Sequence, residues 1–180
     1  MPSVFLSPSL QEWNPYVNGG NEEYYMNLIA DAIEPYLTAS GISYARNTPS
    51  QKLSQAIAQS NAGSYDLHFA IHSNAAGAAN SGNIRGTDVY YYPTSSKGKR
   101  AAEITAENFK DIYPLPDKVR TVASSTLAEL KQTKAPAVLI ETAYHDNIAD
   151  AEWIQENIGQ IGRNLAMSIA QFLGVPFVDL

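Results

Sequence analysis

The chain has 180 residues, with 12 Lys and Arg against 18 Asp and Glu, so its formal net charge is -6. It contains no cysteine, which excludes disulfides, thiol nucleophiles and cysteine-ligated zinc. The acidic balance argues against a nucleic-acid partner, because a phosphate-binding surface needs a positive field. A chain of this length buries one sizeable core, so we expect residues 1–180 to form a single domain.

No segment has the pattern of a membrane-inserting sequence. Residues 1–6 lack both the basic stretch and the long apolar core of a secretory signal. No run approaches the ~18 consecutive apolar residues of a membrane span. We therefore expect no membrane insertion.

Strand-like apolar runs alternate with helical patterns in the first half of the chain. The helical segments place apolar side chains three or four residues apart, which is the spacing of one helix face. The expected strands are residues 4–6, 42–46 and 67–71, and the expected helices are residues 23–39 and 53–57.

The second half continues this alternation after a loop rich in Ala, Gly, Asn and Ser at residues 74–83. The expected strands are residues 86–92 and 137–140, and the expected helices are residues 99–112, 149–157 and 158–172. Strands joined by crossover helices indicate an α/β fold with a mainly parallel central sheet and helices on both faces.

Polar side chains follow the predicted buried strands. His72 follows one central strand, Glu141 follows the other, and Gln11 lies in the loop after the first strand. Glu23 begins the first long helix. Because sites in such sheets form beyond the carboxyl ends of the strands, we expect these side chains to converge.

A histidine and two glutamates at one edge suit zinc-dependent hydrolysis. Catalytic Zn²⁺ takes about three protein ligands and keeps one position for water, whose pKa it lowers towards ~7. A further carboxylate then accepts the proton of the water and passes it to the leaving amine. We predict Glu23 and His72 as metal ligands and Glu141 as the catalytic base.

Four segments in order carry a family resemblance. Residues 66–75 are a strand that ends in His72, a small residue, Asn and Ala, and residues 136–144 carry Glu141. Glu23 precedes an Asn-Leu pair, and residues 86–92 form a Gly-led, tyrosine-rich strand. This pattern resembles the zinc-dependent N-acetylmuramoyl-L-alanine amidases, the cell-wall amidases of bacteria and their phages.

The resemblance implies a fold, a substrate and a location. It implies an amidase catalytic domain that uses Zn²⁺ to cleave the amide between N-acetylmuramic acid and the L-alanine of the peptidoglycan stem peptide. It also implies action in the cell wall or outside the cell, and we expect a monomer. The alternative from another functional class is a muropeptide-binding module that has lost catalysis.

The chain departs from the family pattern at the first metal ligand. The family places a histidine in the turn after the first strand, whereas residues 7–14 contain none. Gln11 lies near the expected position, although a neutral amide is a poorer zinc ligand than imidazole. His145, four residues beyond Glu141, is the alternative third ligand. Position along the chain favours Gln11, which has an alternative interpretation as an amide that orders its loop.

The remaining candidates have secondary functions. Trp13 is expected to form a wall of the substrate site, and Asn74 to contact substrate or orient the ligand segment. Glu22 is an alternative to Glu23 as a ligand. His68 lies about 13 Å from His72 by strand rise, so the two cannot bind one ion together; we expect His68 to be packed or hydrogen-bonded.

Overall fold

The computed structural model describes all 180 residues and is built around one six-stranded sheet. The strands are β1 (Ser3–Pro8), β2 (Ser43–Arg46), β3 (Leu67–Asn74), β4 (Thr87–Tyr91), β5 (Val119–Ala123) and β6 (Ala137–Tyr144). They are arranged in the order β2-β1-β3-β6-β4-β5. All neighbouring strands run parallel except β4 and β6, which pair antiparallel.

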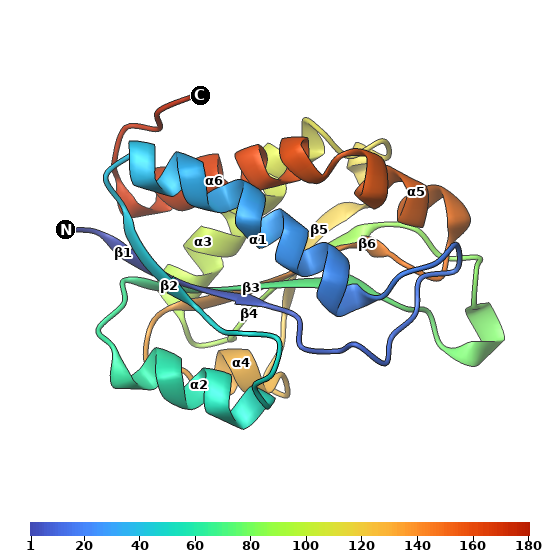
Figure 1. Ribbon diagram of the computed structural model, residues 1–180, viewed down its shortest axis with the longest axis horizontal. Coiled ribbons are helices and arrows are strands. Elements are labelled where there is room, and N and C mark those ends of the chain that lie inside the picture. The colour runs from blue at the N-terminus through green and yellow to red at the C-terminus, as the bar shows by residue number, and fades with distance from the viewer.

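Helices cover both faces of the sheet. The α-helices are α1 (Glu22–Ala39), α2 (Leu53–Ala62), α3 (Ser96–Lys110), α4 (Ala128–Lys131), α5 (Ile148–Glu156) and α6 (Ile158–Leu173). Short 3₁₀ turns are η1 (Ala78–Asn80) and η2 (Pro116–Lys118). Helices α1, α3 and α6 lie on one side of the sheet, and α2 and α4 lie on the other (Figure 1). None of the helices is both long and apolar enough to cross a membrane.

The two faces of the sheet have different compositions because successive side chains of a strand point to opposite sides. On β3, Phe69 and Ile71 belong to a cluster of 30 buried apolar residues under α1, α3 and α6. His68, Ala70 and His72 face α2 and α4, where the apolar cluster has four members. Those four are Ala70, Leu130, Ala137 and Leu139.

The α/β fold and the mainly parallel sheet are confirmed, but two elements are missing from the sequence prediction. β5 is an edge strand with mostly exposed side chains, so it has no apolar run to mark it. α4 is only four residues long, too short to show a helical period. β3 and β6 also extend beyond the predicted ends, so His72 and Glu141 lie within strands rather than after them.

Helix α1 begins at a residue that decides which glutamate enters the site. The side chain of Asn21 accepts a hydrogen bond of 2.9 Å from the backbone N–H of Tyr24, which caps the helix. The helix therefore starts at Glu22, one residue before the predicted start. Its buried side chains are Glu22, Met26, Ile29, Ala30, Ile33 and Leu37. Glu22 thus extends the buried face of the helix by one turn.

Candidate active site

His72 and Glu141 form the centre of the candidate site. They lie opposite each other on β3 and β6 as register partners, on the face of the sheet that carries α2 and α4. His72 is buried and Glu141 is partly exposed. The structure therefore places a histidine and a glutamate from distant segments of the chain next to each other.

The carboxylate that reaches His72 belongs to Glu22 and not to Glu23. Glu22 is buried, and its Oε1 lies 2.9 Å from His72 Nδ1. Successive residues of a helix point about 100° apart, so only one of two adjacent glutamates can face the sheet. The structure therefore brings Glu22, the alternative, to His72 and leaves Glu23, the predicted ligand, outside this contact.

Gln11 reaches the same place from the loop after β1. Its Nε2 lies 3.5 Å from His72 Nδ1. Asn14 connects it to the helix, because Asn14 Nδ2 donates to Gln11 Oε1 at 2.7 Å and to Glu22 Oε2 at 2.8 Å. An imidazole, a carboxylate and a primary amide therefore meet around Nδ1 of His72.

His145, the alternative third ligand, lies beside Ser73 and Tyr16. Its Nδ1 lies 2.9 Å from Ser73 Oγ, and its ring stacks on Tyr16 with centroids 5.2 Å apart. The Tyr16 hydroxyl donates to the same Ser73 Oγ at 2.8 Å. This buried group attaches the loop that precedes α1 to the end of β3. The structure does not bring Nδ1 of His145 to His72 or Glu22.

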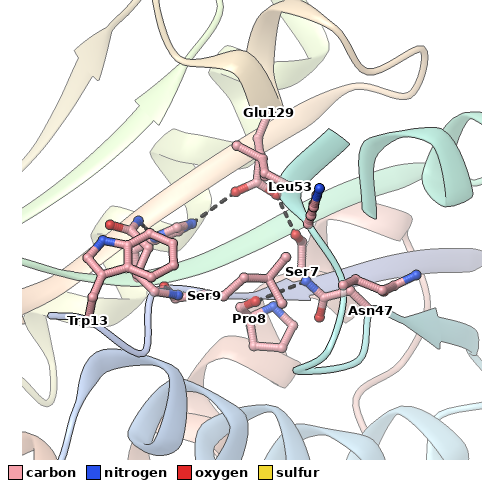
Figure 2. A pocket seen from close by; sticks show the side chains of 12 residues that line it. Ser7, Pro8, Ser9, Trp13, Asn47, Leu53 and Glu129 are labelled. Carbon is pink, nitrogen blue, oxygen red and sulfur yellow. Dashed lines mark hydrogen bonds and ion pairs between the residues drawn. The ribbon is translucent and has the colours of Figure 1, made fainter. Parts of the chain in front are cut away.

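A cavity of about 290 Å³ opens beside the imidazole. Gln11, His72 and Glu129 line it, and Trp13, whose side chain is mostly exposed, forms part of its wall (Figure 2). Asn74 is not among the lining residues, and its Oδ1 accepts the backbone N–H of Ala75 at 2.9 Å. Trp13 therefore lies where a substrate wall was predicted, whereas Asn74 caps its own strand end.

Glu141 has an environment that favours its protonated form. Burial raises the pKa of Glu141 to about 7, and the negative charges of Glu22 and Asp88 add to this effect against the opposing charge of His72. Glu141 Oε2 is buried and has no hydrogen-bond partner. A carboxyl group that titrates near neutral pH can both accept and release a proton.

Glu129 is a site residue that the sequence analysis missed. It is buried on α4, and its Oε2 lies 2.9 Å from His72 Nε2. Its Oε1 lies 3.0 Å from His68 Nε2 and accepts a hydrogen bond from Ser7 Oγ. Burial favours the neutral acid, but the hydrogen bonds from His68 and His72 outweigh it and hold the pKa of Glu129 well below its usual range. His68 is thus hydrogen-bonded, as expected.

His72 lies between two carboxylates, one at each ring nitrogen. Burial favours the neutral ring, but hydrogen bonds to Glu129 and Glu22 outweigh this and raise the pKa of His72 well above its ordinary 6.5. Burial similarly opposes ionisation of Glu22, yet its hydrogen bonds with His72 and Asn14 lower the pKa of its carboxyl group. In the metal-free protein the three groups form a charged, hydrogen-bonded chain.

The side chains around His72 Nδ1 offer a metal ion only two strong ligands. Glu22 supplies a carboxylate and His72 an imidazole nitrogen, which are ordinary zinc donors. No group of three His, Asp or Glu side chains in the structure could hold a metal ion. A third protein donor at this place would have to be neutral, and the nearest neutral side chain is Gln11, whose Nε2 lies 3.5 Å from His72 Nδ1. The residues present therefore offer zinc a carboxylate and an imidazole, whereas Gln11 directs Nε2 towards His72 and its donor oxygen Oε1 towards Asn14.

The overall fold is that of known cell-wall amidase structures. AmiC2 of Nostoc punctiforme superposes with a TM-score of 0.83 at 19% identity, covering 96% of this chain and 97% of that one. The catalytic domain of CwlV from Bacillus (Paenibacillus) polymyxa var. colistinus also gives a TM-score of 0.83 at 19% identity, covering 98% and 100% of the two chains. At this level of identity the likeness shows the shared fold.

The sequence comparison defines the family. The family model described as N-acetylmuramoyl-L-alanine amidase matches residues 9–171, and the chain belongs to this family. It is 28% identical over 163 residues to the N-acetylmuramoyl-L-alanine amidase LytC of Bacillus subtilis (strain 168), covering 87% of this chain. The match covers 32% of LytC, so the chain spans about a third of the length of this curated relative.

Proposed function

We propose that this protein hydrolyses the amide bond between N-acetylmuramic acid and the L-alanine of the stem peptide in peptidoglycan. The observation that supports this most is the meeting of Glu22, His72 and Glu141 at one edge of an amidase-family domain. Water supplies the oxygen that bonds to the carbonyl carbon of the lactyl group. The carbon–nitrogen bond breaks, and the stem peptide leaves with a free amino group on its L-alanine.

We propose Zn²⁺ as the cofactor, held by Glu22 and His72. The third protein donor would be the side-chain oxygen of Gln11, which accepts from Asn14 in this structure and would have to turn towards the ion. When bound, zinc polarises a carbonyl group and makes a water molecule more acidic. His145 is kept as the alternative third donor, although Nδ1 of its ring is hydrogen-bonded to Ser73.

Glu141 is proposed as the group that moves the proton. Its carboxylate accepts a proton from the attacking water and delivers it to the nitrogen of the leaving alanine. The pKa of about 7 suits both halves of this transfer, because proton transfer is most effective when the group titrates near the working pH. Its side chain already shares one face of the sheet with His72.

Trp13 and Asn74 are proposed to contact the substrate. The exposed indole of Trp13 forms part of the wall of the cavity beside His72, and it offers a flat apolar surface to a sugar or peptide group. Asn74 lies at the end of the same strand as His72. We further propose that the protein acts as a monomer, in the cell wall or outside the cell.

Release of a dye from labelled cell walls tests the assignment of Glu141. Wild-type protein is expected to release dye, and Glu141→Ala is expected to reduce the rate about 10²–10⁴-fold, which is the usual contribution of a general base. Glu103→Gln, on the exposed surface of α3, serves as the control and keeps the wild-type rate. Undiminished release by Glu141→Ala would remove Glu141 from the mechanism.

Metal analysis tests the donor set separately. Gln11→Ala is expected to lower the zinc content of the purified protein, whereas His145→Ala is expected to retain it. Full zinc occupancy in Gln11→Ala together with zinc loss in His145→Ala would reverse the assignment of the third ligand.

A muropeptide-binding module is the second candidate function. The observation that favours it is the neutral amide of Gln11 beside His72. With this amide in place of a histidine, only Glu22 and His72 remain as strong metal ligands. This alternative predicts that a soluble muropeptide binds with no release of alanine-terminated product. Turnover by the wild-type protein would exclude it.

A further inference from the structure

A chain of hydrogen bonds runs along the face of the sheet at the candidate site. Ser60 Oγ lies 2.9 Å from His68 Nδ1, and His68 Nε2 lies 3.0 Å from Glu129 Oε1. The second oxygen of Glu129 lies 2.9 Å from His72 Nε2, and His72 Nδ1 lies 2.9 Å from Glu22. Side chains from α2, β3, α4 and α1 are therefore joined in one line.

Glu129 is the central member of this chain, and its burial needs a physical reason. An ionised carboxylate removed from water is strongly destabilising unless donors replace the lost hydration. Here three donors do so: Ser7 and His68 at Oε1 and His72 at Oε2. The backbone of α4 adds a further link, since Thr133 Oγ1 donates to the carbonyl of Glu129 at 2.6 Å.

The arrangement fixes which nitrogen of His72 donates to Glu129 and which one faces Glu22. A carboxylate only accepts hydrogen bonds, so Nε2 of His72 must donate to Glu129. Nδ1 is then the nitrogen that faces Glu22 and Gln11. In metal sites, a carboxylate on the far nitrogen of a ligating histidine fixes the tautomer and ring orientation and makes the ligand more basic.

His68 limits how far Glu129 can move. The His68 ring is fully buried and stacks on Phe5, with centroids 5.5 Å apart and an interplanar angle of 13°. Its Nδ1 pairs with Ser60, so its Nε2 is directed at Glu129. Glu129 is thus held from the side opposite His72.

We propose that Glu129 is a positioning residue of this site: its carboxylate, held by Ser7 and His68, accepts the Nε2 proton of His72 and thereby turns Nδ1 towards Glu22 and Gln11. This inference rests on the proposed function in that it assigns Nδ1 as the metal-binding nitrogen. It differs from a purely structural function, in which Glu129 would stabilise α4 without affecting the chemistry of His72.

NMR of the metal-free protein labelled with ¹⁵N-histidine tests the proposal without any activity measurement. Wild-type protein is expected to show a strongly deshielded, slowly exchanging Nε2 proton for His72. Glu129→Gln replaces one acceptor oxygen with an amide donor, so this signal is expected to move upfield or disappear. Glu103→Gln serves as the matched charge control and keeps it. A His72 signal unchanged in Glu129→Gln overturns the proposal.

Zinc affinity provides the second measurement, by competition between the metal-free protein and a chromophoric chelator. Glu129→Gln is expected to weaken zinc binding about 10–100-fold, the usual effect of losing such an outer partner. Unchanged affinity, with the fold intact, shows a structural function only. Wild-type protein that binds no zinc contradicts the proposed cofactor instead. In that case the NMR signal of the His72 Nε2 proton still tests the hydrogen bond to Glu129.

If Glu129→Gln does not fold, the spectrum of the wild-type protein tests whether Nδ1 is the zinc-binding nitrogen of His72. The proposal predicts that the His72 Nε2 proton persists after zinc is added, because zinc takes Nδ1. Loss of the Nε2 proton on zinc addition, with Nδ1 protonated, would overturn it.

Discussion

The two faces of the central sheet differ in what they bury. Beneath α1, α3 and α6, a cluster of 30 apolar side chains forms a continuous core. Beneath α2 and α4, a cluster of only four apolar side chains, with Phe5 stacked on His68, accompanies two histidines and a glutamate that are buried and joined by hydrogen bonds. Since the same strands build both faces, the apolar face can stabilise the fold while the polar face holds ionised groups at fixed distances.

The stability of the polar face depends on complete hydrogen bonding rather than on the area of apolar surface that it buries. Each ring nitrogen of His68 and His72 has a partner, and both oxygens of Glu129 are used. Glu141 Oε2 is buried without a partner, and so is Oδ1 of Asn47, which lines the cavity. A single unsatisfied carboxylate oxygen beside a saturated network is consistent with a group that exchanges protons during a reaction.

The largest expected effect separates the two adjacent glutamates of α1. Glu22→Gln removes the carboxylate at His72 Nδ1 and is expected to weaken zinc binding by more than about 100-fold, beyond the loss typical of outer partners. Glu23→Gln is the matched control, since its side chain points about 100° away, and it should bind zinc like wild type. Competition with a chelator measures both. Equal losses in the two variants would contradict the placement of Glu22.

The next effect compares the two faces directly through neighbouring residues of β6. Ile140→Ala removes a fully buried side chain from the large cluster and is expected to lower the free energy of unfolding by about 2–5 kcal/mol. Leu139→Ala lies in the four-residue cluster, where fewer apolar neighbours surround the deleted atoms, and should cost less. Urea unfolding of both variants measures the difference. A larger loss for Leu139→Ala would break the comparison.

A smaller effect is the pH dependence of stability in the metal-free protein. Glu22 and Glu129 have lowered pKa values, so their contribution is present above about 4.5 and is lost as the pH falls through the folded values. His72 has a raised pKa, so its contribution is complete below about 6.5 and is lost as the pH rises through the folded value. Stability from this network should therefore be greatest between these two values.

Urea midpoints measured from acid to alkaline pH test this expectation. The Glu129→Gln variant should show a flatter profile than wild type, because one charged member of the network is absent. Glu103→Gln should retain the wild-type profile. Identical profiles for wild type and Glu129→Gln would show that the polar face contributes no pH-dependent stability.

Much of the apolar face could be predicted from the sequence, and less of the polar face. The strands that contain Phe69 and Val138 are marked by apolar runs, and α1 by its helical spacing. The same spacing also indicates which glutamate is buried. Met26 and Ile33 lie on the buried face of α1, and one turn before Met26 this face contains Glu22 and not Glu23. The local match to the family pattern favoured Glu23, whereas the structure places Glu22 beside His72.

Glu129 could not be predicted because its partners are distant in the sequence. It lies 57 residues from His72 and 61 from His68, and only the closure of α4 over β3 brings them together. In the sequence it is one glutamate between Leu127 and Leu130, and those two leucines were a signal that this short segment is buried. The position of Gln11 was predicted better, since it follows directly from the end of β1.

The most direct test of the proposed reaction identifies the chemical ends that the protein produces from purified peptidoglycan. New amino ends are labelled with a dinitrophenyl group after digestion, and new reducing sugar ends are measured in parallel. We expect wild-type protein to produce amino-terminal L-alanine with no new reducing sugars, and Glu22→Gln to produce neither. New reducing ends, or amino ends on any other residue, would contradict the assignment of this site to the muramoyl–alanine amide.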